Sequence, residues 1–499
     1  MKFNRLSFFR LPIIMPLIAC FIFFHNIYAQ DATTKIDQND LREYIQTLSS
    51  IQFEGRSVDN NGQIKTQDFI IERFKTLQLE PYSSEGYLEK FNLNMTDKRE
   101  VYLKTRKGQK LLNFNRMVCT DDVQPINQID YELVFGGNGS AQELDQIEVE
   151  NRLVLVYLEN ANDEFALKQR LEARNAKGLI IFFEDDFRFE RMKRQYNDVH
   201  YRKKFSLADF SPGTIDFELE PIEIFGLFPT LHYFVIPETE VKNVMGVSKS
   251  KLIKITHKKK IKKVPIAKIS IHYEQANKTL ETANVIGIIR GESEKSIIIS
   301  AHYDHVGTED DRYYPGADDN ASGVAALLEL AEEYKQYEKP RYTMVFLAFS
   351  SEEGGLLGSY YHVNYTDFDS EKALCNINMD MISRCDNRHT DCNYLYCVID
   401  KHSETLNNLV REVDKLFPDC ACNYTQYDSN FFERTDTYNF SKKGIPSVLF
   451  FAGFHDDYHK STDTVEKIDF DLLENRVLLI NKIIKQIQST SQVISKGQQ

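Results

Sequence analysis

Continuous runs of apolar residues alternate with helical patterns along the second half of the chain. Strand-like runs stand at 285–289, 297–299, 344–349, 374–379 and 448–452. Apolar residues at helical spacing predict helices at 321–337, 355–362, 406–416 and 469–488. Strands that are apolar throughout are typical of a parallel sheet buried on both faces. The pattern therefore predicts an α/β fold with a mainly parallel, helix-covered sheet.

Residues 116–264 have a different pattern, with more strands and fewer helices. Strands are expected at 133–135, 153–158, 179–183, 234–236 and 252–255, and a helix at 165–176. We expect a small strand-rich domain inserted into the main one. Its last residues, 258–263, are rich in lysine, and such a run is most simply a solvated linker.

The start of the chain has the pattern of an export signal. Lys2, Arg5 and Arg10 precede an apolar stretch of 14 residues that ends at Phe24, and Ala29 suits a cleavage site. The stretch is too short for a spanning helix, which needs about 20 residues. We expect an exported protein, periplasmic or extracellular, with no integral membrane segment once the signal is removed. Because Leu17-Ile18-Ala19-Cys20 is similar to a bacterial lipobox, a lipid anchor at Cys20 is the alternative.

These patterns divide the chain into five segments. We expect a signal peptide at 1–29, the amino-terminal part of the main domain at 30–115, the insert at 116–264, the rest of the main domain at 265–488 and a loose tail at 489–499. Residues 36–80 have a helical pattern and are expected to pack on the main domain.

Composition narrows the class of protein. Apolar residues make up 42% and charged residues 27%, as in soluble globular proteins, and the net charge of −13 argues against a nucleic-acid partner.

Six of the cysteines fall between Cys375 and Cys422, so one or two local disulfides are expected. Cys375 itself stands in a strand-like run and is expected to be a buried free thiol.

Histidine and acidic side chains follow four of the expected strands. They are His302 and Asp304, Glu352 and Glu353, Asp380, and His455 and His459, in chain order. A further pair, Asp318-Asp319, opens the helix expected at 321–337. Ligands bind beyond the carboxyl ends of strands in open α/β sheets. These side chains are therefore candidates for one shared site.

Each cluster alone has an ordinary structural explanation. Asp318 and Asp319 could cap the helix that follows them, and Glu352-Glu353 could be a solvated loop. Five such clusters at strand ends by chance are improbable, and burying so many carboxylates without a cation would be costly. A donor set of histidine and carboxylate favours zinc.

The motifs around these residues resemble the M28 peptidases, which are co-catalytic di-zinc aminopeptidases. The segments are Ser300-Ala301-His302-Tyr303-Asp304-His305, Pro315-Gly316-Ala317-Asp318-Asp319-Asn320-Ala321-Ser322-Gly323, Ser351-Glu352-Glu353-Gly354, Asn378-Met379-Asp380 and Asp457-Tyr458-His459. The resemblance covers about 265–485 and implies a zinc exopeptidase fold of the phosphorylase/hydrolase-like kind. The insert resembles a protease-associated domain.

The resemblance also implies a role for each residue. Two zinc ions are expected, with Asp319 bridging both. Glu353 and His459 would complete the shell of one ion, and His302 and Asp380 the shell of the other. Asp304 would accept the second N–H of His302, and Glu352 would be the general base. The implied function is hydrolysis of the N-terminal peptide bond of peptide substrates.

Other functions on the same fold stay open. A carboxypeptidase would need a basic side chain for the terminal carboxylate, and the motifs contain none. A glutaminyl cyclase is disfavoured because the chain has no tryptophan, and a non-catalytic binding protein because both base and ligands are present. The chain carries Thr435-Asp436-Thr437 where family members commonly have Ser-Asp-His, which leaves open any substrate contact at Thr437.

Overall fold

The computed structural model describes residues 36–490. Within that range it leaves out 106–110, 113–117, 120–128, 160–163, 185, 191–202, 209–230, 310–311, 337–338, 401–402, 419 and 425–428. The expected signal peptide and most of the expected tail lie outside the described residues. Among the described helices, none is long and apolar enough to span a membrane.

The main domain is built on a mixed, largely parallel sheet, as predicted. At its centre β11 (Ser293–His302) lies parallel to both β14 (Tyr342–Phe349) and β15 (Ala373–Asp380), and β18 (Ser447–Phe451) is parallel to β15. Antiparallel neighbours flank this centre: β10 (Ala267–Ile289) beside β14 and β16 (Tyr394–Ile399) beside β18, with β17 (Ala421–Asn423) at the edge.

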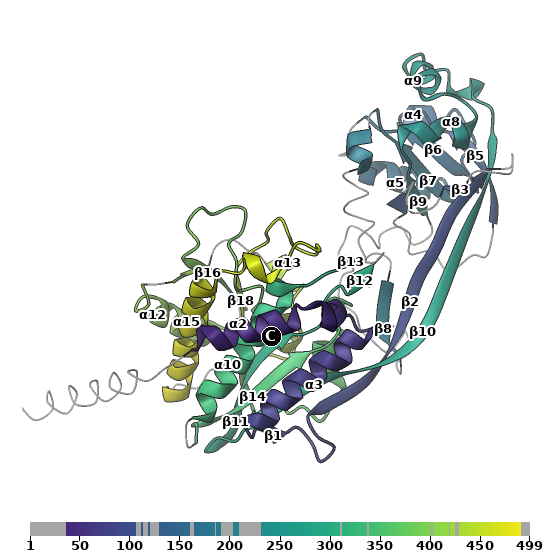
Figure 1. Cartoon of the computed structure of the whole chain (residues 1–499). Helices are drawn as coiled ribbons and strands as arrows, with labels where there is room; N and C mark the ends of the chain where they lie inside the picture. The colour runs from purple at the N-terminus through teal and green to yellow at the C-terminus, as the bar shows by residue number, and fades with distance from the viewer. Residues whose placement is uncertain are drawn as a thin grey trace, which may run out of the picture.

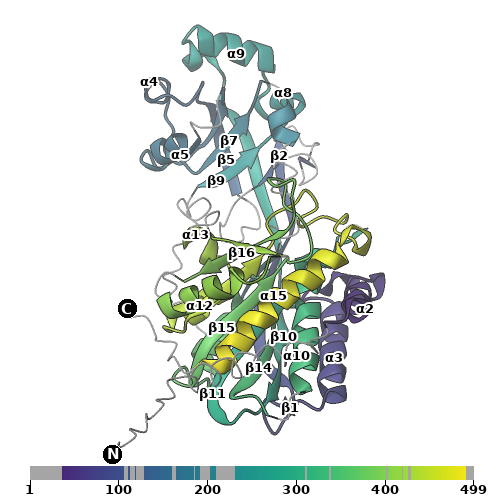
Figure 2. The same cartoon turned by 90° about the vertical axis from the view of Figure 1, so that its left-hand side faces the viewer.

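Helices cover both faces of this sheet. One face packs against α2 (Gln38–Leu48), α3 (Asn61–Thr76), α10 (Gly323–Lys335), α12 (Glu404–Asp414) and α15 (Phe470–Ser489), and Figure 2 shows these helices on one side. The other face packs against α11 (Leu357–Tyr365) and α14 (Thr437–Lys442). Ile297 and Ile299 point to the first layer and Ile298 to the second, and all three are buried. This double burial explains the continuous apolar runs.

The strands of the insert lie between two apolar layers. Its parallel strands are β5 (Ile129–Phe135), β6 (Leu153–Tyr157), β7 (Gly178–Phe182) and β9 (His232–Val235), with β4 (Val118–Cys119) antiparallel at the edge. Its helices include α4 (Ala141–Leu144), α5 (Glu164–Glu172), α8 (Val241–Met245) and α9 (Lys249–His257). Four of the expected strands are therefore confirmed.

The strand expected at 252–255 is wrong, because these residues lie within α9. Leu252 and Thr256 are its buried positions, four residues apart, so a helix turns both toward the insert. The local sequence suggested a strand, and packing against the insert overrides that local preference.

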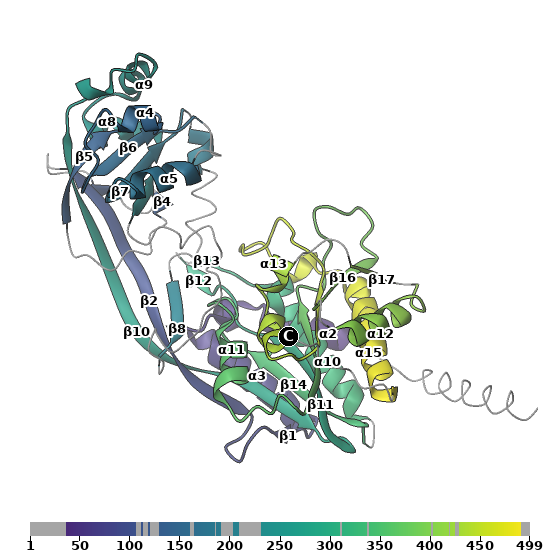
Figure 3. The ribbon, with the colours of Figure 1, turned by 180° about the vertical axis from the view of Figure 1, so that it is seen from behind.

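A long two-stranded ribbon connects the insert to the main domain. β2 (Leu88–Thr105) pairs antiparallel with β10 from Val285 back to Ile269, and Figures 1 and 3 show both strands running between the two parts. β10 pairs with β14 at one end and with β5 at the other, so one continuous sheet passes through both parts.

The strand β8 (Lys203–Leu207) brings part of the insert back to the main domain. It pairs with β2 between Leu93 and Asp97. Leu207 is buried with Val58, Phe91 and Leu357, which belong to the main domain. The side chain of Phe205 lies against Gly354, where an added Cβ would come within 3.2 Å of Phe205 Cβ. The insert thus contacts the turn that carries Glu352 and Glu353.

Deleting residues 116–264 is therefore expected to leave the metal ligands in place but to lower stability. None of the expected ligands lies in this segment, but its loss uncovers the apolar side chains around Leu207. Leu207→Ser in the full chain should reproduce part of this loss of stability and lower the free energy of unfolding by about 3 kcal/mol. Thermal unfolding and zinc content test both variants. Loss of zinc from a folded deletion variant would contradict the expected division.

Candidate active site

The carboxyl ends of the central strands bring the expected residues together. His302 and Asp380 are the last residues of β11 and β15, and Glu352 and Glu353 lie in the turn after β14. His459 comes from the loop after β18. Parallel strands end at the same edge of a sheet, so residues far apart in sequence meet there.

Asp319 lies at the centre of this group. One carboxylate oxygen, Oδ1, is 3.6 Å from Nε2 of His302. The other, Oδ2, is 3.1 Å from Nε2 of His459 and 3.6 Å from Nδ1 of His305. Asp319 is only 2% exposed, so both of its carboxylate oxygens face the interior of the site rather than bulk water.

Two sets of three residues could each hold a metal ion, and they share Asp319. His302, Asp319 and Asp380 offer ligand atoms within 4.8 Å of one another, and His305, Asp319 and Glu353 form the second set. His459 joins the second set, with Nε2 at 3.3 Å from Oε2 of Glu353. All five expected ligands therefore surround two adjoining positions. Their mixture of imidazole and carboxylate is the chemistry that zinc prefers.

Asp318 faces away from this pair of positions. Its Oδ1 accepts the N–H and O–H of Ser383 at 2.8 and 2.5 Å, and its Oδ2 lies 3.2 Å from Nε2 of His455. Asp463 accepts the backbone N–H groups of both Asp318 and Asp319. Of the two adjacent aspartates, Asp319 is thus the one that faces the other ligands, while Asp318 and His455 support its loop.

Asp304 contacts His302 through its backbone rather than through its carboxylate. Nδ1 of His302 lies 3.2 Å from the carbonyl oxygen of Asp304 and 4.0 Å from the carboxylate. The carboxylate instead accepts the N–H groups of Glu352 and Glu353 at 3.0 and 3.2 Å. The expected contact between the Asp304 carboxylate and the second N–H of His302 is therefore corrected. The backbone carbonyl of Asp304 faces the imidazole, and its carboxylate holds the backbone of Glu352 and Glu353 in place.

Glu352 borders the first metal position without belonging to it. Its Oε2 is 3.9 Å from Nε2 of His302, and its side chain is 14% exposed at the pocket. Burial, and then the charges of Glu353, Asp436 and Asp380, raise the pKa of Glu352 well above its usual range. In this environment the carboxyl of Glu352 takes up a proton more readily than an exposed glutamate does.

Two further residues of the site were not assigned roles from the sequence. His305 is buried and places Nδ1 3.0 Å from Oε1 of Glu353, while burial lowers its pKa and keeps the imidazole neutral. Asp436 is 1% exposed, and burial raises its pKa to about 7. The sequence feature that could have identified His305 as a site residue is its position three residues after His302. For Asp436 the available signal was the segment Thr435-Asp436-Thr437, which stands where family members commonly have Ser-Asp-His.

One wall of the pocket is aromatic. The rings of Phe431, Phe451, Phe454, Tyr458 and His459 follow one another with centroid distances of 5.0, 5.1, 4.8 and 3.6 Å. Arg434, which is exposed, also lines the pocket. The pocket thus combines an acidic, histidine-rich floor with an apolar wall and one basic side chain.

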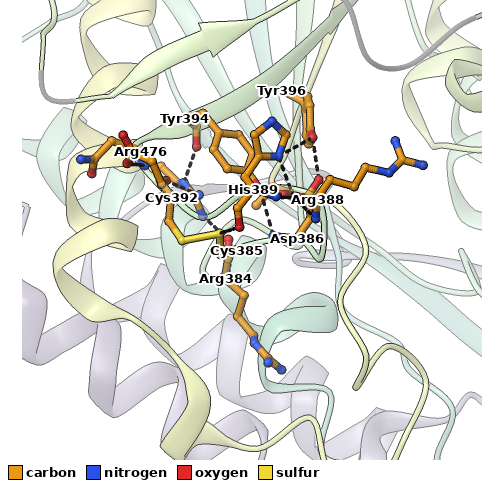
Figure 4. The surroundings of a disulfide bond; sticks show 12 residues. Arg384, Cys385, Asp386, Arg388, His389, Cys392, Tyr394, Tyr396 and Arg476 are labelled. Atoms are coloured by element: carbon orange, nitrogen blue, oxygen red, sulfur yellow. Dashed lines mark hydrogen bonds and ion pairs between the residues drawn. A yellow bond between two sulfur atoms is a disulfide. The ribbon is translucent and has the colours of Figure 1, made fainter.

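A disulfide closes the loop that follows Asp380. It joins Cys385 to Cys392, which confirms one of the expected local bridges. Figure 4 shows Arg476 of α15 beside it. Arg476 donates to the carbonyl groups of Ile382, Arg384, Cys392 and Tyr394. Cys375 is a free, buried thiol as expected, and burial raises its pKa to about 12.

Arg56 ties the amino-terminal segment to the site. Its guanidinium is fully buried and donates to five carbonyl groups, those of Leu48, Tyr303, Pro315, Gly316 and Asp319. These acceptors lie on α2, on the turn after β11 and on the loop of the central aspartate. Although burial lowers the pKa of Arg56 to about 10, the group stays charged at neutral pH.

Arg56→Lys is therefore expected to destabilise the fold by about 2–4 kcal/mol, since an ammonium cannot reproduce the planar fork. Zinc affinity should fall as well, because the loop of Asp319 loses its support. Arg73→Lys is the control, because Arg73 forms a partly exposed ion pair with Glu43 and should cost at most about 1 kcal/mol. Thermal unfolding measures both. Equal stability of the two variants would contradict this role of Arg56.

Comparison with known proteins supports the interpretation of these motifs. Residues 284–484 match the model of peptidase family M28. These residues form an M28 peptidase domain. Curated relatives include a probable leucine aminopeptidase of Trichophyton verrucosum, 27% identical over 40% of this chain and 55% of the relative. Aminopeptidase YwaD of Bacillus subtilis is 28% identical over 38% of this chain and 41% of the relative. The chain therefore spans about half the length of such relatives.

Solved structures of M28-like aminopeptidases share the fold over almost the whole chain. The zinc aminopeptidase BSAP of Bacillus subtilis aligns with a TM-score of 0.59 and 18% identity, covering 93% of this chain and 98% of that one. An aminopeptidase from Aneurinibacillus sp. strain AM-1 aligns with a TM-score of 0.57 and 20% identity, covering 90% and 93%. The M28 fold is thus confirmed, and the insert is consistent with a protease-associated domain.

Proposed function

We propose that this M28 family member is an exported, zinc-dependent aminopeptidase that hydrolyses the N-terminal peptide bond of peptides. The observation that carries the proposal is the pair of ligand sets sharing Asp319. We assign His302 and Asp380 to one zinc ion, Glu353 and His459 to the other, and Asp319 to both. When bound, two zinc ions supply Lewis acidity that polarises the scissile carbonyl and activates water.

The residues of the chain then supply proton transfer and orientation. Glu352 borders the pocket and takes the proton of the attacking water, which it returns to the leaving amine. The carboxylate of Asp304 holds the backbone of Glu352 and Glu353, so the base and the ligand keep a fixed separation. His305 hydrogen-bonds Glu353 and orients that ligand in the same way.

The pocket favours a free N-terminus followed by an apolar side chain. Of the carboxylates on its floor, Glu352 is not assigned to zinc and can attract the ammonium group of an unblocked peptide. The aromatic wall of Phe431, Phe451 and Phe454 offers apolar contact to the first side chain. The probable leucine aminopeptidases among the curated relatives agree with this preference.

Substrate pairs test this function. The protein should hydrolyse leucine p-nitroanilide at least 100-fold faster than its N-acetylated form. Acetylation removes the charge of the ammonium group, and a factor of about 100 corresponds to the loss of one ion-paired contact. Among free aminoacyl anilides, leucine and phenylalanine should be preferred to aspartate. A chelator should abolish the activity and zinc should restore it. Faster hydrolysis of the N-acetylated substrate would contradict an aminopeptidase.

Arg434 favours a carboxypeptidase as the second candidate. Its guanidinium could bind a terminal carboxylate, the role for which the sequence motifs contain no basic residue. The discriminating substrates are an N-acyl dipeptide with a free carboxylate and the leucine anilide. Our proposal expects hydrolysis of the anilide alone, and cleavage of the acyl dipeptide would favour the carboxypeptidase.

Export is proposed on two observations. The amino-terminal pattern of basic and apolar residues suits a signal peptide, and the disulfide between Cys385 and Cys392 suits an oxidising compartment. Detection of the protein, cleaved near Ala29, outside the cytoplasm would support this proposal. Labelling with a fatty-acid analogue that requires Cys20 would show the lipid-anchored alternative instead.

A further inference from the structure

A second acidic cluster lies where α2 packs on α10. Asp40 of α2 and Glu329 and Glu332 of α10 each offer a carboxylate oxygen, and these oxygens lie within 4.8 Å of one another. The two glutamates are three residues apart, which puts them on one side of the helix. Glu329 stands six residues beyond the start of α10, about 9 Å along the helix axis. None of the three belongs to the zinc ligand sets.

Glu329 is the residue that distinguishes this cluster from an ordinary acidic surface. It is only 2% exposed, and its Oε2 accepts the backbone N–H of Asp37 at 2.9 Å. Its Oε1 is buried and has no hydrogen-bond partner among the described residues. A buried carboxylate oxygen without a partner costs free energy, and native structures seldom tolerate one.

The charges around Glu329 are predominantly negative. Burial, together with the carboxylates of Asp40, Glu332 and Asp37, raises its pKa to about 8. Arg73, a cation that acts on the neighbouring Tyr44, has its guanidinium over the Tyr44 ring and pairs with Glu43. The buried Oε1 of Glu329 can therefore be satisfied by either a proton or a bound cation.

We propose that Asp40, Glu329 and Glu332 bind a calcium ion that fastens α2 to α10. All three donors are carboxylate oxygens, the ligands of hard cations, and no imidazole or thiol of the described residues joins the set. Calcium takes about 6–8 oxygens at ~2.4 Å in flexible geometry, so oxygens from two helices can serve. Asp40 and Glu332 are partly exposed, which lets water complete the shell.

The site would stabilise the amino-terminal segment on the main domain. α2 packs its buried residues Leu41, Ile45 and Leu48 into the same core as α10. Leu48 also provides one of the carbonyl groups that accept from Arg56. Calcium would thus act on the stability of this helix pair, independently of the proposed zinc chemistry.

Calcium titration of the zinc-loaded protein tests the site, because zinc already fills the active site. Isothermal titration should find one calcium per chain with a Kd of about 10⁻⁴–10⁻³ M. Addition of 10 mM CaCl₂ should raise the unfolding midpoint by about 3–5 °C above NaCl of equal ionic strength. Glu329→Gln should abolish both effects, and its calcium-free midpoint should equal or exceed that of the unchanged protein, since it removes a buried charge.

Control variants separate the site from general charge effects. Glu294→Gln removes one charge from a side chain that is 83% exposed and should keep the full calcium response. Asp40→Asn should weaken calcium binding at least about tenfold even if Glu329→Gln fails to fold. No calcium effect in the unchanged protein, or an undiminished effect in Glu329→Gln, would overturn the proposal. An equal response to MgCl₂ would overturn the assignment to calcium.

Discussion

Replacement of Glu352 by glutamine is expected to lower kcat by about 10²–10⁴-fold while the bound zinc stays unchanged. Glutamine keeps the size and hydrogen bonding of the side chain but cannot accept a proton from water. KM should change little, because the lost interaction is made mainly in the transition state. Steady-state kinetics and metal analysis of one preparation measure both quantities.

The neighbouring Glu353→Gln is the matched comparison. Its side chain lies 3.0 Å from His305 and 3.3 Å from His459, within the second ligand set, and we expect this variant to lose zinc. Excess zinc should restore part of its activity but none of the activity of Glu352→Gln. If zinc instead rescued only Glu352→Gln, the two assignments would have to be exchanged. Near-normal rates for both variants would show that the pair is a solvated acidic turn.

Asp319→Ala is expected to remove both zinc ions and essentially all activity. Loss of a supporting residue typically weakens metal binding by about 10–100-fold, and a bridging ligand should cost more because both ions lose it. The control is Asp318→Asn, whose side chain contacts Ser383 and His455 instead. This control should keep two zinc ions at reduced thermal stability. Retention of both ions by Asp319→Ala would show that Asp319 is not the bridge.

The local pattern of the sequence was sufficient to predict the strands and helices of much of the main domain. Each continuous apolar run became a strand buried on both faces, because both helical layers press on the sheet. The same topology explains why residues from His302 to His459 meet, since parallel strands end at one edge. The di-zinc resemblance then distinguished Asp319 from Asp318, a choice that periodicity alone cannot make.

Features that depend on distant contacts were not predicted. The strand β8 is recognisable only by its pairing with β2, and α9 only by the packing of Leu252 and Thr256. The carbonyl contact of Asp304 and the hydrogen bond of His305 depend on how one turn faces another. Such details arise from tertiary packing, which spacing along the chain does not encode.

The most direct test of the account is a zinc titration of chelator-treated protein, followed by the rate of leucine p-nitroanilide hydrolysis. The two ligand sets that share Asp319 predict a rate that reaches its plateau at two zinc equivalents per chain. Metal analysis at the plateau should find both ions bound. Full activity in the metal-free protein, or a plateau at one equivalent with a single bound ion, would contradict the two-zinc aminopeptidase.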